Sequence, residues 1–444
     1  RHERGEIAFR KTVESKCFAC LAIGTLCENS SFAQRMADTG IVPALLKLLK
    51  LDNVDMSLHV AFVLNKLSVF SFTRKDFQEH QVASVLANWN EATTEHATTY
   101  LIAALRRLCC DESRWVELNA NIVNFMSTSS CKLQNVGRCR EIASCICHLA
   151  LLNEARKYIV ESEMFRQLLK LVQSLDEEIS RFALGALANI ANDCRYHDLV
   201  AQQTGVLHLL VRSTTSASLS TVRESSRAIA SVLSSTLVHS PFLDDDGIRL
   251  LMNLSNNEDV ECTYNAAVAF RKLSANINCH EKLFSLDGVT SIIKLSRRGE
   301  QNIHLLSAAA LQDISSNQHF KVALADLGVI KTAMELASHS DIGIIAIAFG
   351  IIRHLSVPML LKRKLSDCGI VSMMVQCVSQ SDNEELCYEC SSSMANMAEH
   401  AQNRLKLVHL GAVPCLVSLC NHTSFRVKRE TARAFSLLSS SPEL

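Results

Sequence analysis

The stretch ALANIA at residues 186–191 places the polar residue Asn189 between two apolar positions, Leu187 and Ile190. The same arrangement returns every 41 or 42 residues along the whole chain. Apolar positions three residues apart lie on one side of an α-helix, and the residue between them points away from that side. The repeat therefore predicts a long helix in every copy, with one position per copy facing solvent or a partner.

Three columns of residues define the repeat. The central column corresponds to Asn189, and the two flanking columns, two positions earlier and one position later, are apolar in every copy. The central column consists of Thr25, Lys66, Arg107, His148, Asn189, Ser231, Lys272, Asp313, His354, Asn396 and Leu437. The flanking columns consist of Ile23, Leu64, Leu105, Ile146, Leu187, Ile229, Phe270, Leu311, Ile352, Met394 and Phe435, and of Leu26, Leu67, Leu108, Leu149, Ile190, Val232, Leu273, Ile314, Leu355, Met397 and Leu438. We expect both flanking columns to be buried.

Length and composition favour one elongated helical protein. A chain of 444 residues would ordinarily form two or three globular domains, but a repeat spanning it from end to end predicts a single solenoid over residues 1–444. The low content of glycine (14), proline (5) and aromatic residues (5%) fits stacked helices better than a sheet. We therefore predict an all-α fold.

Charge and cysteine content restrict the possible partners and compartments. The 45 basic residues balance the 45 acidic ones, so no overall charge favours nucleic acid or an anionic membrane. The 18 cysteines are scattered within apolar helical patterns, which favours a reducing cytoplasmic compartment, with the nucleus as an alternative. The richest apolar stretch, residues 342–352, is interrupted by glycine and is predicted to be a core helix. Because the chain begins at Arg1 without a methionine and has no signal-peptide pattern, we expect a fragment of a longer protein.

A glycine recurs between the long helices, at Gly40, Gly205, Gly247, Gly288, Gly328, Gly369 and Gly411. Glycine can adopt a positive φ at the end of a helix, so we expect a short helix to end at each of these positions. An aliphatic stretch such as residues 41–49 follows and predicts a middle helix. A polar loop such as residues 52–55 then leads to the long helix.

A short helix, a glycine, a middle helix, a polar loop and a long helix in about 41 residues resemble the armadillo repeat. The most similar segments are residues 38–43 (DTGIVP), 186–191 (ALANIA) and 393–398 (SMANMA), and the resemblance covers essentially the whole chain. It implies a right-handed superhelical solenoid of about ten to eleven armadillo repeats whose long helices line a concave groove. HEAT repeats are the nearest alternative, but the glycine and the central-column asparagines favour armadillo repeats.

The pattern is weaker between residues 75 and 165, where Gln81, Asn121 and Glu163 occupy the glycine positions. We expect shortened or irregular first helices there. Residues 213–220 (STTSASLS) predict a flexible connection, with a phosphorylation site as the alternative interpretation.

The resemblance also predicts a binding site, since the central-column asparagine of armadillo proteins hydrogen-bonds the backbone of an extended peptide. This chain keeps two asparagines in the column and has cations in three successive copies, Lys66, Arg107 and His148. Cations in a row suit an acidic or phosphorylated segment, and arginine can bind such groups with two hydrogen bonds. The alternative interpretation is that these cations serve only solubility. The predicted partner-binding residues are Lys66, Arg107, His148, Asn189, Lys272, His354 and Asn396.

The leading hypothesis is a non-catalytic scaffold that binds extended segments of other proteins. A nuclear-transport cargo adaptor is one alternative, although importin-α proteins carry tryptophan one helical turn before the asparagine, and here no tryptophan stands at these preceding-turn positions. They hold Leu21, Phe62, Ala103, Ser144, Gly185, Arg227, Val268, Ala309, Gly350, Ser392 and Arg433. The substrate-recruiting arm of a ubiquitin ligase, with its catalytic module outside this chain, is the other alternative.

No sequence pattern predicts catalysis or a cofactor. The Cys-x-x-Cys pairs at residues 17–20 and 387–390 lie nine repeats apart and cannot share a metal ion. Neither a phosphate-binding Gly-x-x-x-x-Gly-Lys-Ser/Thr loop nor a Gly-x-Ser-x-Gly turn is present. The acidic run at residues 244–246 suits a helix N-terminus better than a cation site. We therefore expect no metal, cofactor, small-molecule substrate, nucleic acid or membrane insertion.

Overall fold

The computed structural model describes residues 2–51, 53–82, 85, 95–109, 135–244 and 246–440. Within these ranges the secondary structure consists of α-helices and short 3-10 helices without a β-strand, which confirms the all-α prediction. The chain forms two compact units, Arg1–Val232 (unit 1) and Leu233–Leu444 (unit 2). That the two units form one continuous solenoid stays a prediction.

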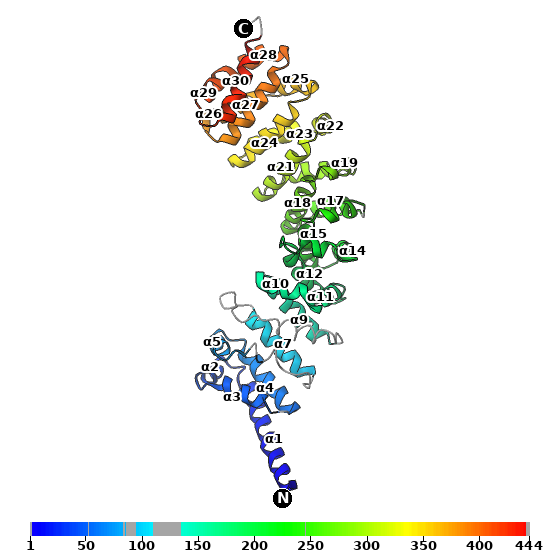
Figure 1. The fold of residues 1–444 in the computed structure, drawn as a ribbon, viewed down its shortest axis with the longest axis vertical. Coiled ribbons are helices and arrows are strands. Elements are labelled where there is room, and N and C mark those ends of the chain that lie inside the picture. The colour runs from blue at the N-terminus through cyan, green and yellow to red at the C-terminus, as the bar shows by residue number, and fades with distance from the viewer. Residues whose placement is uncertain are drawn as a thin grey trace. The chain divides into compact units, whose positions relative to one another are not determined.

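The long helices occur where the columns predict them (Figure 1). Those of unit 1 are α1 (His2–Leu26), α4 (Val54–Leu67), α7 (Glu95–Cys109), α9 (Val136–Leu149), α12 (Glu177–Ala191) and α15 (Leu219–Val232). Those of unit 2 are α18 (Val260–Ser274), α21 (Gln301–Ser316), α24 (Ile342–Leu355), α27 (Glu384–Ala398) and α30 (Phe425–Leu438). Within each unit every long helix packs against the next one. One copy cannot bury its apolar side alone, so this stacking of neighbours builds a solenoid core in each unit.

Short and middle helices complete each copy. In unit 1 the short elements are α2 (Ser30–Asp38), η1 (Ser71–Thr73), α5 (Arg74–Glu79), α10 (Asn153–Glu161) and α13 (His197–Ala201), and the middle helices are α3 (Ile41–Leu49), α11 (Glu163–Val172) and α14 (Val206–Ser213). In unit 2 the short elements are η3 (Thr236–Val238), α16 (His239–Asp244), η4 (Ile277–Cys279), α19 (His280–Ser285), α22 (Lys321–Asp326), α25 (Met359–Asp367) and α28 (Ala401–His409), and the middle helices are α17 (Gly247–Ser255), α20 (Gly288–Leu295), α23 (Val329–Ala337), α26 (Ile370–Gln380) and α29 (Ala412–Leu419). In the region expected to be irregular, α5 has six residues but α10 has nine, and Asn121 lies outside the described residues.

The flanking columns form the core of both units, as predicted. Nearly all their members are buried, while Ile23, Leu108 and Phe435 are half-buried and Leu26 is 50% exposed. Leu26 ends α1, which packs against only one long helix, α4, in the part of unit 1 that is described. Each leucine or isoleucine that is fully buried contributes roughly 1.5–3 kcal/mol to folding.

The polar loops begin the long helices. A side-chain oxygen thirteen residues before the central column accepts a backbone N–H of the first turn and so satisfies one of its unpaired donors. These capping residues are Asn53, Asn135, Asp176, Asp259, Asp341 and Asn383. These six loop residues, to which the periodicity assigned no role, therefore fix where their long helices start.

The recurring glycines serve two different purposes. Five of them have a positive φ just before a middle helix, as expected: Gly40, Gly205, Gly328, Gly369 and Gly411. The expectation of a positive φ is wrong at Gly247 and Gly288, because the preceding Asp246 and Asp287 adopt it instead. A Cβ on Gly247 would lie 2.3 Å from the Phe242 carbonyl oxygen, so here glycine permits close packing against the preceding helix.

The serine-rich connection is held by local hydrogen bonds. The hydroxyls of Ser213, Thr214 and Thr215 donate to carbonyls of α14, and Ser218 Oγ lies 3.0 Å from Ser220 Oγ. Such bonds from side chain to backbone are typical of turns that follow helices. They give the loop an ordered path, and phosphorylation there stays a prediction.

Among the described helices, none alone has both the length and the apolar character of a membrane span, but the pair Val54–Leu67 and Ser71–Glu79, bent by 112°, meets these criteria together.

Candidate functional site

The central column lies along the boundary between consecutive long helices. Asn189, Ser231 and Asn396 are only 8%, 7% and 6% exposed, so the prediction that every central residue lies open to solvent or a partner is wrong for these three. Thr25 is exposed and the remaining members are half-buried. The physical reason is that side-by-side packing of long helices brings residues about 40 positions apart into contact, and side chains of the neighbouring helices cover the column.

The two lysines predicted to bind a partner each contact the copy that precedes them. Lys66 Nζ forms an ion pair with Glu28, which lies just after α1. Lys272 Nζ donates a hydrogen bond to Ser234 Oγ over 2.7 Å. Lys66 also lies 5.3 Å from the centre of the Phe62 ring, one turn earlier on α4. Both ammonium groups are therefore already engaged by acceptors of their own unit.

Arg107 and His148 also contact backbone or side-chain oxygens. Arg107 Nη1 donates to the Asn65 side-chain oxygen, to the Asn65 carbonyl over 3.3 Å and to Ser68 Oγ over 3.4 Å. His148 Nδ1 lies 2.6 Å from the Ser144 carbonyl, one turn earlier on the same helix. Arg107 thus connects α7 to α4, whereas the His148 contact stays within α9.

Burial weakens the charge of two predicted site residues. His354 Nδ1 lies 2.9 Å from Ser315 Oγ, and burial, with the cations Arg353 and Lys321, lowers the pKa of His354 to about 4. Burial also lowers the pKa of Lys272 to about 8. At neutral pH, His354 is therefore an uncharged hydrogen-bonding group, and Lys272 is an ammonium with a reduced preference for the charged state.

Asn189 is covered by an arginine of the following long helix. Arg227 Nη1 donates to Asn189 Oδ1 over 2.6 Å, and Arg227 Nη2 donates to the Gly185 carbonyl over 3.2 Å. Glu224, one turn earlier on α15, accepts from Arg227 over 2.6 Å. A Cβ on Gly185 would lie 3.0 Å from Cys147 Sγ and 3.4 Å from Arg227 Nη2, so the missing side chain makes room for the arginine.

Asn396 has the same arrangement in unit 2. Arg433 Nη2 donates to Asn396 Oδ1 over 2.6 Å and to Glu399 Oε1 over 2.7 Å, and Arg433 Nη1 donates to Glu430 Oε2 over 2.9 Å. The Asn396 amide donates to Ser356 Oγ over 2.9 Å. Both central-column asparagines thus have their side-chain oxygen occupied by an arginine, which we call the arginine cap.

From the sequence, Arg227 and Arg433 stand out only as positions that lack the tryptophan of importin-α proteins, and no role was predicted for them. Each stands one turn before the central-column residue of its own helix. A glutamate precedes each by three residues, Glu224 before Arg227 and Glu430 before Arg433. An i,i+3 pair of opposite charges is a recognisable helical pattern. In both cases the preceding copy has an asparagine in its central column, and this combination in the sequence could have indicated the arginine cap.

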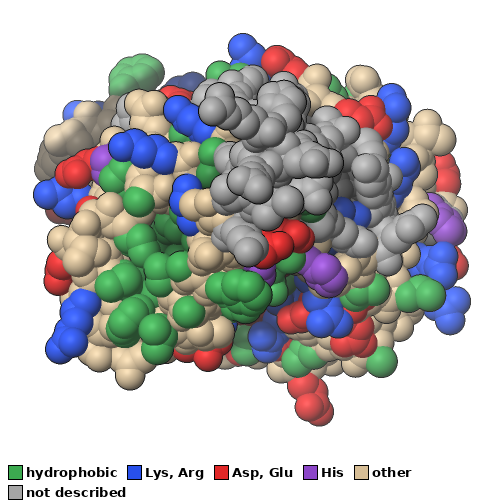
Figure 2. Space-filling model, turned by 90° about the horizontal axis from the view of Figure 1, so that it is seen from below, with side chains coloured by type: hydrophobic (Ala, Val, Ile, Leu, Met, Phe, Trp, Pro, Cys, Tyr) green, Lys and Arg blue, Asp and Glu red, His purple; other side chains and the backbone are tan. Residues whose placement is uncertain are grey.

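Charges on the described surface are mixed. Figure 2 shows basic and acidic side chains interspersed on the face in view, without an extended area of one sign. Of the acidic run, Asp244 pairs with Lys282, Asp246 precedes α17, and Asp245 lies outside the described residues. The structure thus offers local charge patterns rather than one dominant field.

Within the described ranges, no group of three or more His, Cys, Asp or Glu residues is arranged to hold a metal ion. Every cysteine that the structure describes is free, and both Cys-x-x-Cys pairs are buried. Burial raises the pKa of Cys17, Cys20, Cys387 and Cys390, which disfavours the thiolate that binds metals.

Known proteins resemble this chain in one sequence segment and in fold. Residues 400–440, which contain α28 to α30, match the family model of the armadillo/beta-catenin-like repeat. The crystal structure of an engineered protein from the Northeast Structural Genomics Consortium aligns with a TM-score of 0.80 and 22% identity, over 90% of this chain and 98% of that one. A designed armadillo repeat protein aligns with a TM-score of 0.49 and 20% identity, over 52% of this chain and 99% of that one. No curated protein matches the sequence.

Proposed function

We propose that the chain is an armadillo-repeat protein and acts as a non-catalytic scaffold that binds extended, acidic or phosphorylated segments of partner proteins along the central column. The match of residues 400–440 to the armadillo/beta-catenin-like repeat supports this proposal. Armadillo-repeat solenoids are typically protein-interaction scaffolds. The residues proposed to contact the segment are Lys66, Arg107, His148, Asn189, Lys272, His354 and Asn396.

The observation that carries the proposal is the arginine cap. In each unit an arginine joins a central-column asparagine to a glutamate, as Arg227 joins Asn189 to Glu224. A carboxylate or phosphate of a partner can replace these acceptors, because arginine binds either group with two parallel hydrogen bonds. Once the arginine turns toward the partner, the side-chain oxygen of the asparagine is available to accept a hydrogen bond from a peptide N–H.

The cations of unit 1 support the same preference. Lys66 is half-buried, and its partner Glu28 is mostly exposed. Ion pairs at such exposure contribute only about 0.2–1 kcal/mol, so an acidic segment can exchange with the internal glutamate at little cost. Arg107 lies on the next described long helix and offers a second contact for the same segment.

The test is a titration of two fluorescein-labelled dodecapeptides, one rich in phosphoserine and aspartate and one rich in lysine, followed by fluorescence polarisation. We expect the acidic peptide to bind more tightly and its affinity to fall with added salt. The double variant Lys66→Glu with Arg107→Glu should weaken binding about tenfold, because two favourable charge contacts become repulsive.

The control is Lys157→Glu with Arg35→Glu, which reverses two exposed cations away from the column. Equal affinity of the Lys66/Arg107 variant and the wild-type protein would reject the site assignment. Tighter binding of the lysine-rich peptide would instead favour the nuclear-transport adaptor, which recognises basic signals.

A further inference from the structure

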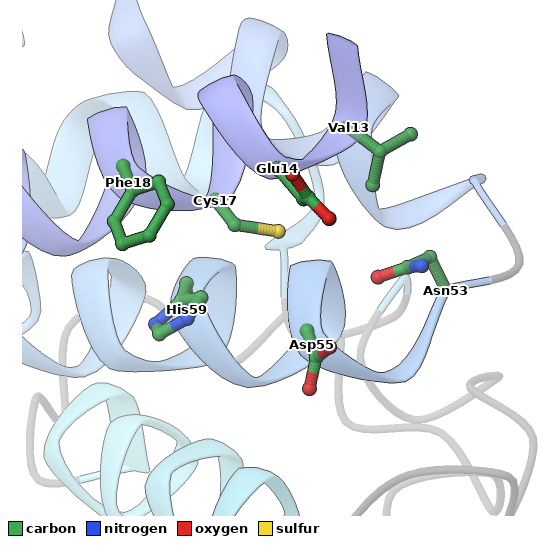
Figure 3. A pocket seen from close by; sticks show the side chains of 7 residues that line it. All are labelled: Val13, Glu14, Cys17, Phe18, Asn53, Asp55 and His59. Atoms are coloured by element: carbon green, nitrogen blue, oxygen red, sulfur yellow. The ribbon is translucent and has the colours of Figure 1, made fainter. Parts of the chain in front are cut away.

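A pocket of about 380 Å³ opens between α1 and α4 (Figure 3). Its lining residues are Val13, Glu14, Cys17 and Phe18 of α1, together with Asn53, Asp55 and His59 at the start of α4. Glu14 and Phe18 precede Thr25 by 11 and 7 residues, and Asp55 and His59 precede Lys66 by the same numbers. The pocket therefore lies on the proposed path of a bound segment.

Two carboxylates give the pocket its charge, and no ion pair joins either of them to a cation among the side chains that the structure describes. Glu14 extends from α1 and Asp55 from the first turn of α4, on opposite sides of the opening. Elsewhere along the column a carboxylate pairs with a cation, as Glu28 does with Lys66. Asp55 lies in the first turn of α4, where an acidic residue also stabilises the helix, and Glu14 lies in the middle of α1.

The pocket also has an apolar floor and an aromatic rim. Cys17 is only 8% exposed, and its thiol points between the two helices without a hydrogen bond. Burial and the negative charges of Asp55 and Glu14 raise the pKa of the Cys17 thiol, as expected in a negative potential. Phe18 is 71% exposed at the edge of the pocket, so its ring is accessible to a bound side chain.

We propose that this pocket receives a lysine or arginine side chain of the bound segment. The aliphatic stem would lie along Val13 and Cys17, the cation would sit between Glu14 and Asp55, and the Phe18 ring would add a cation–π contact. The inference rests on the proposed function and adds to it: the preferred segment is not uniformly acidic but carries one basic residue where it crosses α1 and α4.

Cys17 provides a probe inside the pocket. Its thiolate attacks a methanethiosulfonate, methanesulfinate leaves, and the reagent's side group remains as a mixed disulfide. The 2-aminoethyl reagent leaves a lysine-like ammonium, whereas the 2-sulfonatoethyl reagent leaves an anion. We expect the rate ratio of cationic to anionic reagent at Cys17 to exceed that at the exposed Cys420 of the same chain about tenfold. Peptide mass spectrometry resolves the two sites.

The variant Glu14→Gln with Asp55→Asn should reduce this ratio to that of Cys420, while Glu154→Gln with Asp382→Asn, two exposed acidic residues elsewhere, should leave it unchanged. A change in general accessibility would alter both reagents in the same direction and leave the ratio intact. An equal ratio at Cys17 and Cys420 in the wild-type protein would overturn the proposal.

A second titration separates this inference from the proposed function. The acidic dodecapeptide is given one central lysine or, as the neutral analogue, norleucine. We expect about fivefold tighter binding of the lysine peptide, and no difference in the Glu14/Asp55 variant. If both peptides bind the wild-type protein equally, the pocket assignment is wrong although the scaffold function stands. If neither binds, the scaffold function fails, and the reagent ratio alone decides whether the pocket selects cations.

Discussion

Replacing Arg433 with methionine is expected to weaken the packing of α30 against α27. The guanidinium donates to Asn396, Glu399 and Glu430 at distances between 2.6 and 2.9 Å, while methionine keeps only the apolar stem. Hydrogen bonds to charged groups contribute about 1.5–3 kcal/mol each when buried. The Arg433 side chain is 38% exposed, and Lys362 still pairs with Glu399, so we expect a net loss of about 1–2 kcal/mol.

The measurement is hydrogen exchange by mass spectrometry, because stacked repeats need not unfold in one step and a single unfolding free energy can be ill-defined. Peptides from α27 and α30 should exchange about ten times faster in the variant, and peptides from α18 should not change. Arg249→Met, an exposed arginine on α17, is the matched control. Unchanged protection of α30 relative to this control would contradict the proposed role of the cap.

A double-mutant cycle isolates the bond between the arginine and the asparagine. The single variants Arg433→Met and Asn396→Ala and their combination are compared by hydrogen exchange in α30. The free energies of opening should show a coupling of about 1 kcal/mol between the two positions, because each substitution removes the same hydrogen bond. Additive effects within about 0.3 kcal/mol would mean that the two side chains meet without stabilising one another, and the reasoning from the arginine cap to partner binding would lose its basis.

Two further substitutions test the packing and the electrostatics of the fold. Gly247→Ala should destabilise unit 2 by about 1–3 kcal/mol in urea unfolding, since its Cβ would contact the Phe242 carbonyl, whereas Gly299→Ala meets open space and should change stability by less than about 0.5 kcal/mol. The pKa of about 4 at His354 makes the unfolded chain bind the extra proton between pH 6.5 and 4, so stability falls as the solution is acidified through that range. The loss amounts to about 3 kcal/mol, and His354→Gln should abolish this part of the pH dependence; identical slopes for the two proteins would refute the assignment to His354.

The positions of the long helices were predictable from the sequence because their cause is local. An apolar pair three residues apart lies on one side of a helix and favours burial of that side, so Leu187 and Ile190 can be assigned to the core without knowledge of distant residues. The start of each helix has a similarly local cause, as at Asp176, whose side chain accepts a hydrogen bond from the Ile179 N–H three residues later. Because the repeat places the same local pattern in every copy, the long helices could be predicted along the whole chain.

The state of the central column was not predictable in the same way. Whether Asn189 is exposed depends on Arg227, which is 38 residues away and reaches it only because α15 packs on α12. The choice between glycine and aspartate for the positive φ has a similar origin. The Phe242 backbone comes so close to residue 247 that only glycine fits there. The positive φ therefore falls on the preceding residue, Asp246. Both features arise from packing between elements that a periodic pattern does not describe.

The central column can be understood as a polar row at a half-buried boundary, where each member must find a partner or leave a buried polar group unsatisfied. Asparagines accept from an arginine of the next helix, as Asn396 does from Arg433, and lysines donate to the copy before them, as Lys272 does to Ser234. A bound segment therefore competes with internal hydrogen bonds instead of meeting free groups. The gain from each position is only the difference between the two sets of bonds, which is small for a neutral segment and larger for one whose charge can displace a glutamate. On this argument, charge selects the partner, and the asparagines add backbone contacts only after the arginines have moved.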